Sequence, residues 1–506
     1  MSLSRPDSLA MLSFAAYSEG KLADKVNLSG AYLVGSDDIP LRADITFAKG
    51  IISCKKRAPG PAGLALLWDV PGVGSILLET IRVQERDRPY VLQVELARGR
   101  LMRLLNKLED WGLLDHADLS EVLSQVDGVR GLVIQALQAD TPAEAARIGE
   151  EALRQAVLVS EELSLHYAAL LLERKKQSGG LSRPVFGCAI HLDKPSELSR
   201  KRLASAFDFV TVPIVWRDIE PSEQTFNWKP LDAWVELLSK HNIPIRGSAL
   251  LSFSEKQVPD WLYIWEHDFD TIRDLAFEHA CRVINRYGQY IQTWVVASGI
   301  HATNCFTFNF EQLMELTRMT AALTKQLCPR GTAIIELVAP WGEYYARNQR
   351  TIPPTLYADM AVQSGISFDA FGLKCIFGLA MDGMYVRDMF QVSAMLDHYC
   401  KLGKPLHITG VEVPSGTERL PGDAESGAPA VDGGVWHEPW SEEIQARWLR
   451  QFVEIALSKS GVETIAWQEF VDHQHQLIPH GGLLRADLTP KTTYNRLVEM
   501  RSELFG

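Results

Sequence analysis

The sequence lacks paired cysteines, long apolar runs and clusters of basic residues. Its seven cysteines form no C-x-x-C pair and are odd in number, which indicates reduced thiols rather than a disulfide framework. No apolar run approaches the roughly 18 residues of a membrane-spanning helix. The net charge of −12 and the shortness of the basic runs argue against a surface for nucleic acid or anionic membranes, because phosphate binding needs clustered positive charge.

The chain also lacks the patterns of secretion and of cofactor or metal binding. Residues 1–20 have no basic start followed by a sustained apolar stretch, so a cytoplasmic location is expected. No Gly-rich dinucleotide loop follows the first strand of the C-terminal region, and we expect no cofactor. His473, His475 and His480 share one loop without metal-ligand spacing, so no metal is expected.

The 506 residues leave room for two or three domains, and three regions differ in their periodicity. Residues 1–88 contain short candidate strands punctuated by Gly and Pro, which predicts a small β-sandwich. Residues 89–180 have apolar residues three and four apart, which predicts a helical bundle or hairpin followed by a linker. Within this region Thr141, Pro142 and Glu144 form a capping pattern at the start of a long helix.

Residues 181–506 alternate buried-strand runs with helical stretches, the pattern of a parallel α/β sheet. Eight βα units in about 320 residues predict a TIM barrel, whose chemistry lies at the C-terminal ends of the strands. An open doubly wound sheet is the alternative. The eight candidate strands are residues 185–190, 209–214, 243–251, 291–297, 333–339, 370–376, 406–413 and 464–467.

Several segments of this region resemble a known family. They are residues 209–221 with the following Phe226-Asn227-Trp228, residues 245–250, Pro259 to Trp261, Trp294, Ile408-Thr409, residues 445–448, Trp467 and Pro490-Lys491. On these residues the barrel resembles a family-10 glycoside hydrolase, the family of endo-β-1,4-xylanases. The resemblance implies a barrel that binds a polysaccharide or oligosaccharide.

The resemblance also implies where the two catalytic glutamates of the family would stand, and both positions hold glycine. Hydrolysis with retention uses two carboxyl groups about 5 Å apart, one as proton donor and one as nucleophile. The donor position maps to Gly299 and the nucleophile position to Gly410. Sugar-binding positions of the family hold Val215, Ser248 and Phe253 instead of its usual residues. Ordinary xylanase activity is therefore expected to be lost.

Residues two positions farther along the strands offer replacement acids. Because side chains alternate along a strand, His301 would lie above Gly299, Glu412 above Gly410 and Glu469 above the tryptophan of the eighth strand. These three residues are the catalytic candidates. The alternatives are a hydrogen-bonding structural role for Glu412, a solvated or capping histidine at 301 and a loop-closing role for Glu469.

Aromatic and acidic residues near the same strand ends are candidates for substrate binding. They are Trp216, Trp467, Glu336, Trp341 and Trp436. Trp436 follows a Gly/Pro-rich insertion, residues 414–434, and long loops at this face usually shape a binding site. The alternative is that Trp436 and its neighbour Trp440 pack the loop onto the barrel.

Three functions follow from these observations. The preferred one is a pseudoenzyme, a barrel that binds a carbohydrate or a protein partner. The second is an active O-glycosyl hydrolase that uses the displaced carboxylates Glu412 and Glu469. The third is a structural or assembly protein whose helical region mediates homo-oligomerisation.

Overall fold

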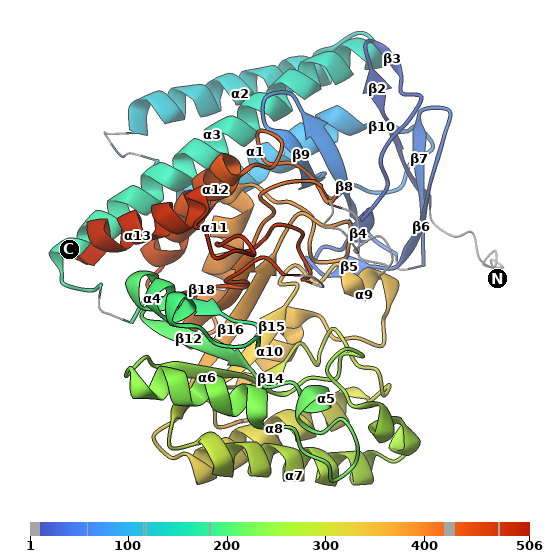
Figure 1. Cartoon of the computed structure of the whole chain (residues 1–506). Helices are drawn as coiled ribbons and strands as arrows, with labels where there is room; N and C mark the ends of the chain where they lie inside the picture. Colours follow the sequence, from blue (N-terminus) through green and yellow to red (C-terminus); the bar gives the residue numbers. More distant parts are fainter. Residues whose placement is uncertain are drawn as a thin grey trace, which may run out of the picture.

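The computed structural model describes residues 11–57, 59–114, 116, 119–181, 184–418, 431–473 and 476–505 (Figure 1). His475 and residues 419–430 of the predicted insertion lie outside the described residues. No helix of the described part is long and apolar enough to cross a membrane.

Two small, mostly antiparallel sheets form the N-terminal part of the chain. One has the strand order β10-β1-β7-β6 and the other β5-β4-β8-β9, and a short hairpin joins β2 and β3. Apolar side chains from both sheets, such as Phe14 and Leu66, share one core. The strands are β1 (Met11–Ala15), β2 (Tyr17–Ser18), β3 (Lys21–Leu22), β4 (Tyr32–Val34), β5 (Pro40–Leu41), β6 (Ala43–Ala48), β7 (Ile51–Lys56), β8 (Gly63–Val70), β9 (Gly74–Glu79) and β10 (Tyr90–Val91).

Three long helices follow: α1 (Leu92–Asp110), α2 (Ser120–Gln138) and α3 (Pro142–Gln177). The Thr141 side chain accepts a hydrogen bond from the backbone N–H of Glu144 at 3.2 Å, which confirms the predicted cap of α3. In Figure 1, α3 runs from the N-terminal sheets past α12 towards the C-terminus. The helix therefore braces the N-terminal part against one side of the C-terminal domain.

The C-terminal region is a closed barrel of eight parallel strands in sequential order, which confirms the predicted TIM barrel. All eight predicted strands are present, with ends that differ by at most a few residues. The strands are β11 (Phe186–Ala189), β12 (Phe209–Pro213), β13 (Ile245–Leu251), β14 (Ile291–Ser298), β15 (Thr332–Val338), β16 (Ala370–Ile376), β17 (Leu406–Glu412) and β18 (Val462–Trp467).

Helices with one apolar face cover the barrel. In α12, for example, Trp448, Phe452 and Ile455 recur at helical spacing and are all buried. The helices are α4 (Glu197–Ala206), α5 (Trp216–Ile219), α6 (Lys229–Lys240), the 3-10 helix η2 (Asp260–Trp265), α7 (Phe269–Tyr287), α8 (Phe310–Leu327), α9 (Tyr344–Arg347), α10 (Pro354–Gln363), α11 (Met389–Cys400), α12 (Glu442–Ser458) and α13 (Thr492–Phe505).

The segment after the insertion ties the N-terminal sheet to the barrel through backbone hydrogen bonds. The N–H of Val435 donates to the carbonyl of Ser75 at 2.7 Å, and that of His437 donates to Val73 at 2.5 Å. Gly434 has a φ of +120°, and a Cβ there would overlap the Ser75 carbonyl oxygen. Only glycine suits this position, because L-residues rarely adopt that φ and the backbones approach closely.

A partly buried histidine–glutamate pair joins the same segment to α3. His437 Nε2 lies 2.8 Å from Glu161 Oε2. Burial opposes charge on both groups, but their mutual attraction prevails, so that the pKa of Glu161 is lowered and the pKa of His437 is raised. Each group is therefore more readily charged in the folded protein than in the unfolded chain.

This pair predicts a pH-dependent contribution to stability. The stabilisation from the charged histidine is fully present below the pKa of about 6.5 that the residue has in the unfolded chain, and it is lost as the pH rises through the pKa in the folded protein. The stabilisation from the charged glutamate is lost as the pH falls below about 4.3. We expect His437→Gln to lower the free energy of unfolding by about 1–2 kcal/mol between about pH 4.5 and 6.5 and by less at pH 9. Denaturant unfolding of both proteins from pH 4 to 9 measures this, and a difference that does not vary with pH would refute it.

Candidate functional site

The end of β14 differs in shape from the straight strand assumed from the sequence. The strand stops at Ser298, and Gly299 has a φ of +61°. A Cβ at this position would lie 3.0 Å from a methyl group of Val338. A glutamate at the proton-donor position would therefore need both a strained backbone and movement of its neighbour.

Gly410, the position predicted to correspond to the nucleophile, faces side chains that fill the space beside it. A Cβ on Gly410 would overlap Gln468 Oε1 and would lie 3.3 Å from Lys374 Cε. Gln468 directly follows β18, and Lys374 belongs to β16. These two side chains therefore occupy the space beside Gly410 at the C-terminal end of the barrel, here called the barrel mouth.

Glu412 lies at the end of β17 and has no exposed surface. Neither carboxyl oxygen has a hydrogen-bond partner among the described residues, and the group lies so close to Gly481 that a Cβ there would overlap Oε1. Burial raises the pKa of Glu412 well above its usual range, the charge of Glu469 raises it further, and Lys374 opposes both. Glu412 therefore holds its proton more strongly than an exposed glutamate does, and it is shielded from a ligand in this conformation.

Glu469 is partly exposed and belongs to a group of polar side chains where β18 closes against β11. His473 Nε2 lies 3.2 Å from Glu469 Oε2, and the His473 ring centre lies 4.5 Å from that of His191. His191 Nδ1 in turn lies 3.1 Å from Asp193 Oδ1. His191 was not among the residues predicted from the sequence, although barrel closure places the first strand beside the eighth.

His301 is buried, so the expectation of a solvated or capping histidine is wrong. Its Nε2 accepts from the N–H of Val338 at 3.3 Å, and its Nδ1 donates to the Tyr344 hydroxyl at 2.6 Å. That hydroxyl donates to the carbonyl of Ile352. Burial lowers the pKa of His301 to about 3, so the ring is neutral at pH 7 and holds two loops together.

Three of the four candidate tryptophans are buried in the packing of the molecule. The Trp216 ring stacks on His279 with centres 4.6 Å apart, and the indole N–H of Trp467 donates to the carbonyl of Gly481 at 2.9 Å. Trp436 is fully buried and donates to Glu161 at 3.0 Å. None of these rings presents an open face to a sugar in this structure.

Glu336 is also buried, inside the barrel wall. One of its carboxyl oxygens accepts a hydrogen bond from the Ser298 hydroxyl at 2.5 Å. This bond links β15 to the end of β14, next to Gly299. Glu336 therefore helps to fix the end of β14 beside β15 at the barrel mouth.

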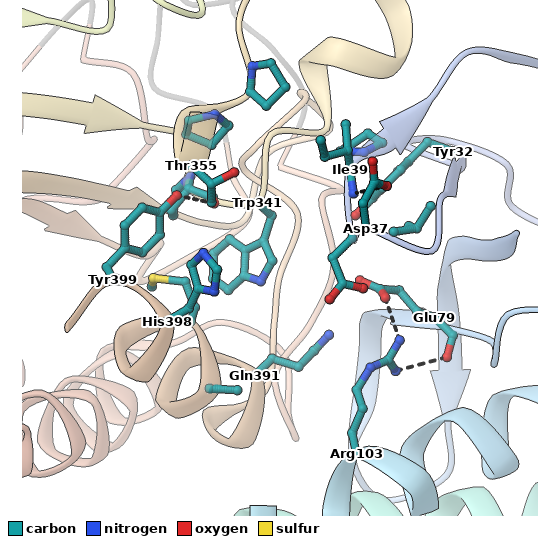
Figure 2. A pocket seen from close by; sticks show the side chains of 18 of the residues that line it. Tyr32, Asp37, Ile39, Glu79, Arg103, Trp341, Thr355, Gln391, His398 and Tyr399 are labelled. Atoms are coloured by element: carbon teal, nitrogen blue, oxygen red, sulfur yellow. Dashed lines mark hydrogen bonds and ion pairs between the residues drawn. The ribbon is translucent and has the colours of Figure 1, made fainter. Parts of the chain in front are cut away.

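Trp341, by contrast, lines a cavity of about 350 Å³ between the N-terminal sheet and the barrel (Figure 2). Figure 2 shows Trp341, His398 and Tyr399 on the barrel side, facing Asp37 and Glu79 on the other. The full lining is Tyr32, Val34, Asp37, Asp38, Ile39, Pro40, Glu79, Arg82, Arg103, Pro340, Trp341, Pro353, Pro354, Thr355, Phe390, Gln391, Ala394, Met395, His398 and Tyr399. The cavity thus combines an aromatic and proline-rich wall with a charged one.

The charged wall is ordered by ion pairs around Glu79. Arg103 and Arg82 contact Glu79 Oε2 at 2.5 and 3.3 Å, and Arg387 lies 3.8 Å from Oε1. Burial alone would raise the pKa of Glu79, but Arg103, Arg82 and Arg387 outweigh it and hold the pKa below its ordinary value. The carboxylate is therefore ionised and fixed in place.

A buried cluster beneath the cavity fixes Trp341. Arg387 contacts Glu343 at 2.7 Å and the Tyr32 hydroxyl at 3.2 Å, and its guanidinium carbon lies 4.8 Å from the centre of the Trp341 ring. Burial raises the pKa of Glu343, although Arg387 opposes the shift. Side chains from β4, the β15 loop and the start of α11 are joined here, so the cavity has a rigid floor.

The described residues contain no group of three or more His, Cys, Asp or Glu side chains placed to bind a metal ion.

Comparison with known proteins supports the resemblance over part of the barrel. Among solved structures, the chain is similar to a family-10 enzyme from Paenibacillus barcinonensis, with 17% identity, a TM-score of 0.47 and coverage of 63% of this chain and 95% of that one. It is also similar to xylanase 10B from Thermotoga petrophila RKU-1 in complex with xylobiose, with 17% identity, a TM-score of 0.45 and coverage of 62% and 94%. Residues 182–314, about a quarter of the chain, match the family model for glycosyl hydrolase family 10, so this part of the barrel is similar to that family.

Proposed function

We propose that this protein is a non-hydrolytic relative of the family-10 glycoside hydrolases that binds a short carbohydrate in the cavity shown in Figure 2. One observation carries the proposal. Of the four tryptophans predicted to contact a sugar, Trp341 lines this cavity with charged groups opposite it, whereas the other three are buried.

The chemistry of the cavity suits an uncharged, hydroxyl-rich ligand. A sugar ring has an apolar C–H face that packs on Trp341 and the neighbouring prolines, and its hydroxyls hydrogen-bond to Asp37 or Arg82 across the cavity. The lining carboxylates and guanidinium groups nearly balance in charge. The volume of about 350 Å³ falls within the range of small-molecule sites.

The barrel mouth supports the non-hydrolytic part of the proposal. Both family positions are glycines; the backbone at Gly299 opposes a glutamate, and the Gln468 side chain occupies the space beside Gly410. Glu412 is shielded from solvent, and His301 is neutral and engaged at both ring nitrogens. A hydrolase needs two carboxyl groups that reach the same glycosidic bond.

Calorimetric titration with xylo- and cello-oligosaccharides tests the binding site. We expect saturable heat with the wild type and an affinity at least about tenfold weaker in Trp341→Ala, because an aromatic anchor contributes more than about 1.4 kcal/mol. Trp265→Ala, at a partly exposed tryptophan of η2, is the matched control and should bind as the wild type does. Binding that is absent from the wild type, or unchanged in Trp341→Ala, would contradict the proposal.

A second candidate function is an active O-glycosyl hydrolase that uses Glu412 and Glu469. It is favoured by the raised pKa of Glu412 beside a second carboxyl group. In glycosidases the carboxyl group that donates the proton typically has a raised pKa. This function requires the segment around Gly481 to move away from Glu412.

Turnover of aryl glycosides decides between the two functions. The second candidate predicts that Glu412→Gln lowers kcat at least about 100-fold, whereas Glu463→Gln, at the opposite end of the barrel, leaves it unchanged. Our preferred function predicts no turnover above background in any of the three proteins.

A further inference from the structure

A second cavity, of about 510 Å³, lies at the N-terminal end of the barrel, opposite the mouth. It is formed by the first residues of several barrel strands and by the end of α3 with the segment that follows it. Its polar lining includes Lys175, Arg246, Thr293, Thr332, His407 and Thr464. Neither the barrel mouth nor the cavity of Figure 2 shares these residues.

Arg246 carries a buried positive charge without a direct counter-ion. Its side chain is only 3% exposed and forms no ion pair among the described residues. One guanidinium nitrogen donates to the Thr464 hydroxyl at 2.9 Å, but Nε and Nη1 have no hydrogen-bond partner in the described part. The carboxylate of Glu336 attracts it from farther inside the barrel, and burial lowers the pKa of Arg246 to about 10, so it remains charged at pH 7.

The formal charges of the other lining groups, Lys175 and Glu463, cancel, so the charge of Arg246 remains in excess. Lys175 Nζ donates to the backbone carbonyls of Leu457 and Lys459, which carry no formal charge. Burial, helped by Arg246, lowers the pKa of His407 to about 3, so that ring is neutral. Glu463 is the one carboxylate among the described lining residues, and its side chain is 56% exposed to water.

We propose that this cavity binds a phosphate group, either as the free ion or carried by a small molecule. The Phe209 ring, 4.3 Å from the guanidinium carbon, and the Thr464 hydroxyl contact Arg246, but neither is a counter-ion. A buried cation without a counter-ion is costly, and a bound oxyanion would offset that cost. A guanidinium, an ammonium and threonine hydroxyls are the donors that phosphate oxygens accept from in proteins. The site shares no lining residue with the proposed carbohydrate site, so the two proposals can be tested independently.

Thermal unfolding with inorganic phosphate, at constant ionic strength kept by KCl, tests the site. We expect a saturable rise in Tm for the wild type, because a ligand that binds only the folded state stabilises it. The rise should vanish in Arg246→Met and need at least about tenfold more phosphate in Lys175→Met, whereas Lys176→Met, at an exposed neighbour, should respond as the wild type does. Trp341→Ala should also keep the full response.

The same measurement distinguishes a site for free phosphate from a site for a phosphorylated small molecule, and it can also contradict the proposal. A tighter response to glucose 6-phosphate than to inorganic phosphate assigns the site to a phosphorylated small molecule, and an equal or weaker one assigns it to the free ion. A rise in Tm no larger than with KCl, or one retained in Lys175→Met at unchanged concentration, overturns the proposal. Lys175 donates only to backbone carbonyls, so this variant keeps the test valid even if Arg246→Met does not fold.

Discussion

Replacing Arg387 by methionine is expected to lower the free energy of unfolding by about 3–5 kcal/mol. Arg387 is fully buried and contacts Glu343 and Tyr32, which are buried as well. Methionine replaces the apolar part of the arginine side chain but carries no charge and no hydrogen-bond donor, so it would leave the Glu343 carboxyl group without its partner. Removal of one member of a buried ion pair is costly because the other charge cannot be solvated.

Denaturant unfolding at pH 7 measures this loss. Arg347→Met is the matched control, because Arg347 pairs with Asp382 at the same junction but is half exposed, and its loss should cost at most about 1 kcal/mol. Arg387→Met should also weaken sugar binding, since the guanidinium packs on the Trp341 ring. Equal losses in the two variants would show that the cluster does not hold the N-terminal sheet to the barrel.

Trp436→Ala is expected to lower the free energy of unfolding by about 3–5 kcal/mol as well. The ring is fully buried, Arg447 lies 5.1 Å from its centre, and its N–H donates to Glu161 of α3. Alanine would leave a large void between α3 and the barrel. Trp436→Phe keeps most of the volume and loses one hydrogen bond to a charged group, so we expect a loss of about 1.5–3 kcal/mol.

The same variants separate packing from ligand binding at Trp436. If the residue packs the loop, Trp436→Phe binds oligosaccharides with the affinity of the wild type while its stability falls. Loss of binding in Trp436→Phe at unchanged stability would instead assign the residue to a sugar site. Calorimetric titration and denaturant unfolding of one preparation measure both quantities.

Much of the fold could be predicted because its signals are local. The buried runs of β13 and β16 and the Thr-Pro cap of α3 each lie within a few neighbouring residues. The barrel itself follows from eight such runs in alternation with helices. Which residues face the core depends on the spacing of apolar residues and on the length of each run, and both can be taken from a single sequence.

The candidate site could be predicted only in part, because its geometry depends on distant segments. The rule that residue i+2 shares a face assumed straight strands, but Gly299 turns the chain and places His301 under other loops. Glu412 is covered by Gly481, nearly seventy residues later in the chain. The cavity beside Trp341 needs Glu79 from the N-terminal sheet, and no local pattern indicates that contact.

The fate of a bound oligosaccharide tests the central claim most directly. Wild-type protein is incubated at stoichiometric concentration with xylotetraose and cellotetraose, and the bound and free sugars are followed by mass spectrometry. The account predicts that the bound tetrasaccharide is recovered intact and that Trp341→Ala retains much less of it than the wild type does. Shorter products that form with the wild type and disappear with Glu412→Gln would contradict it, because they would require a working pair of carboxyl groups at the barrel mouth.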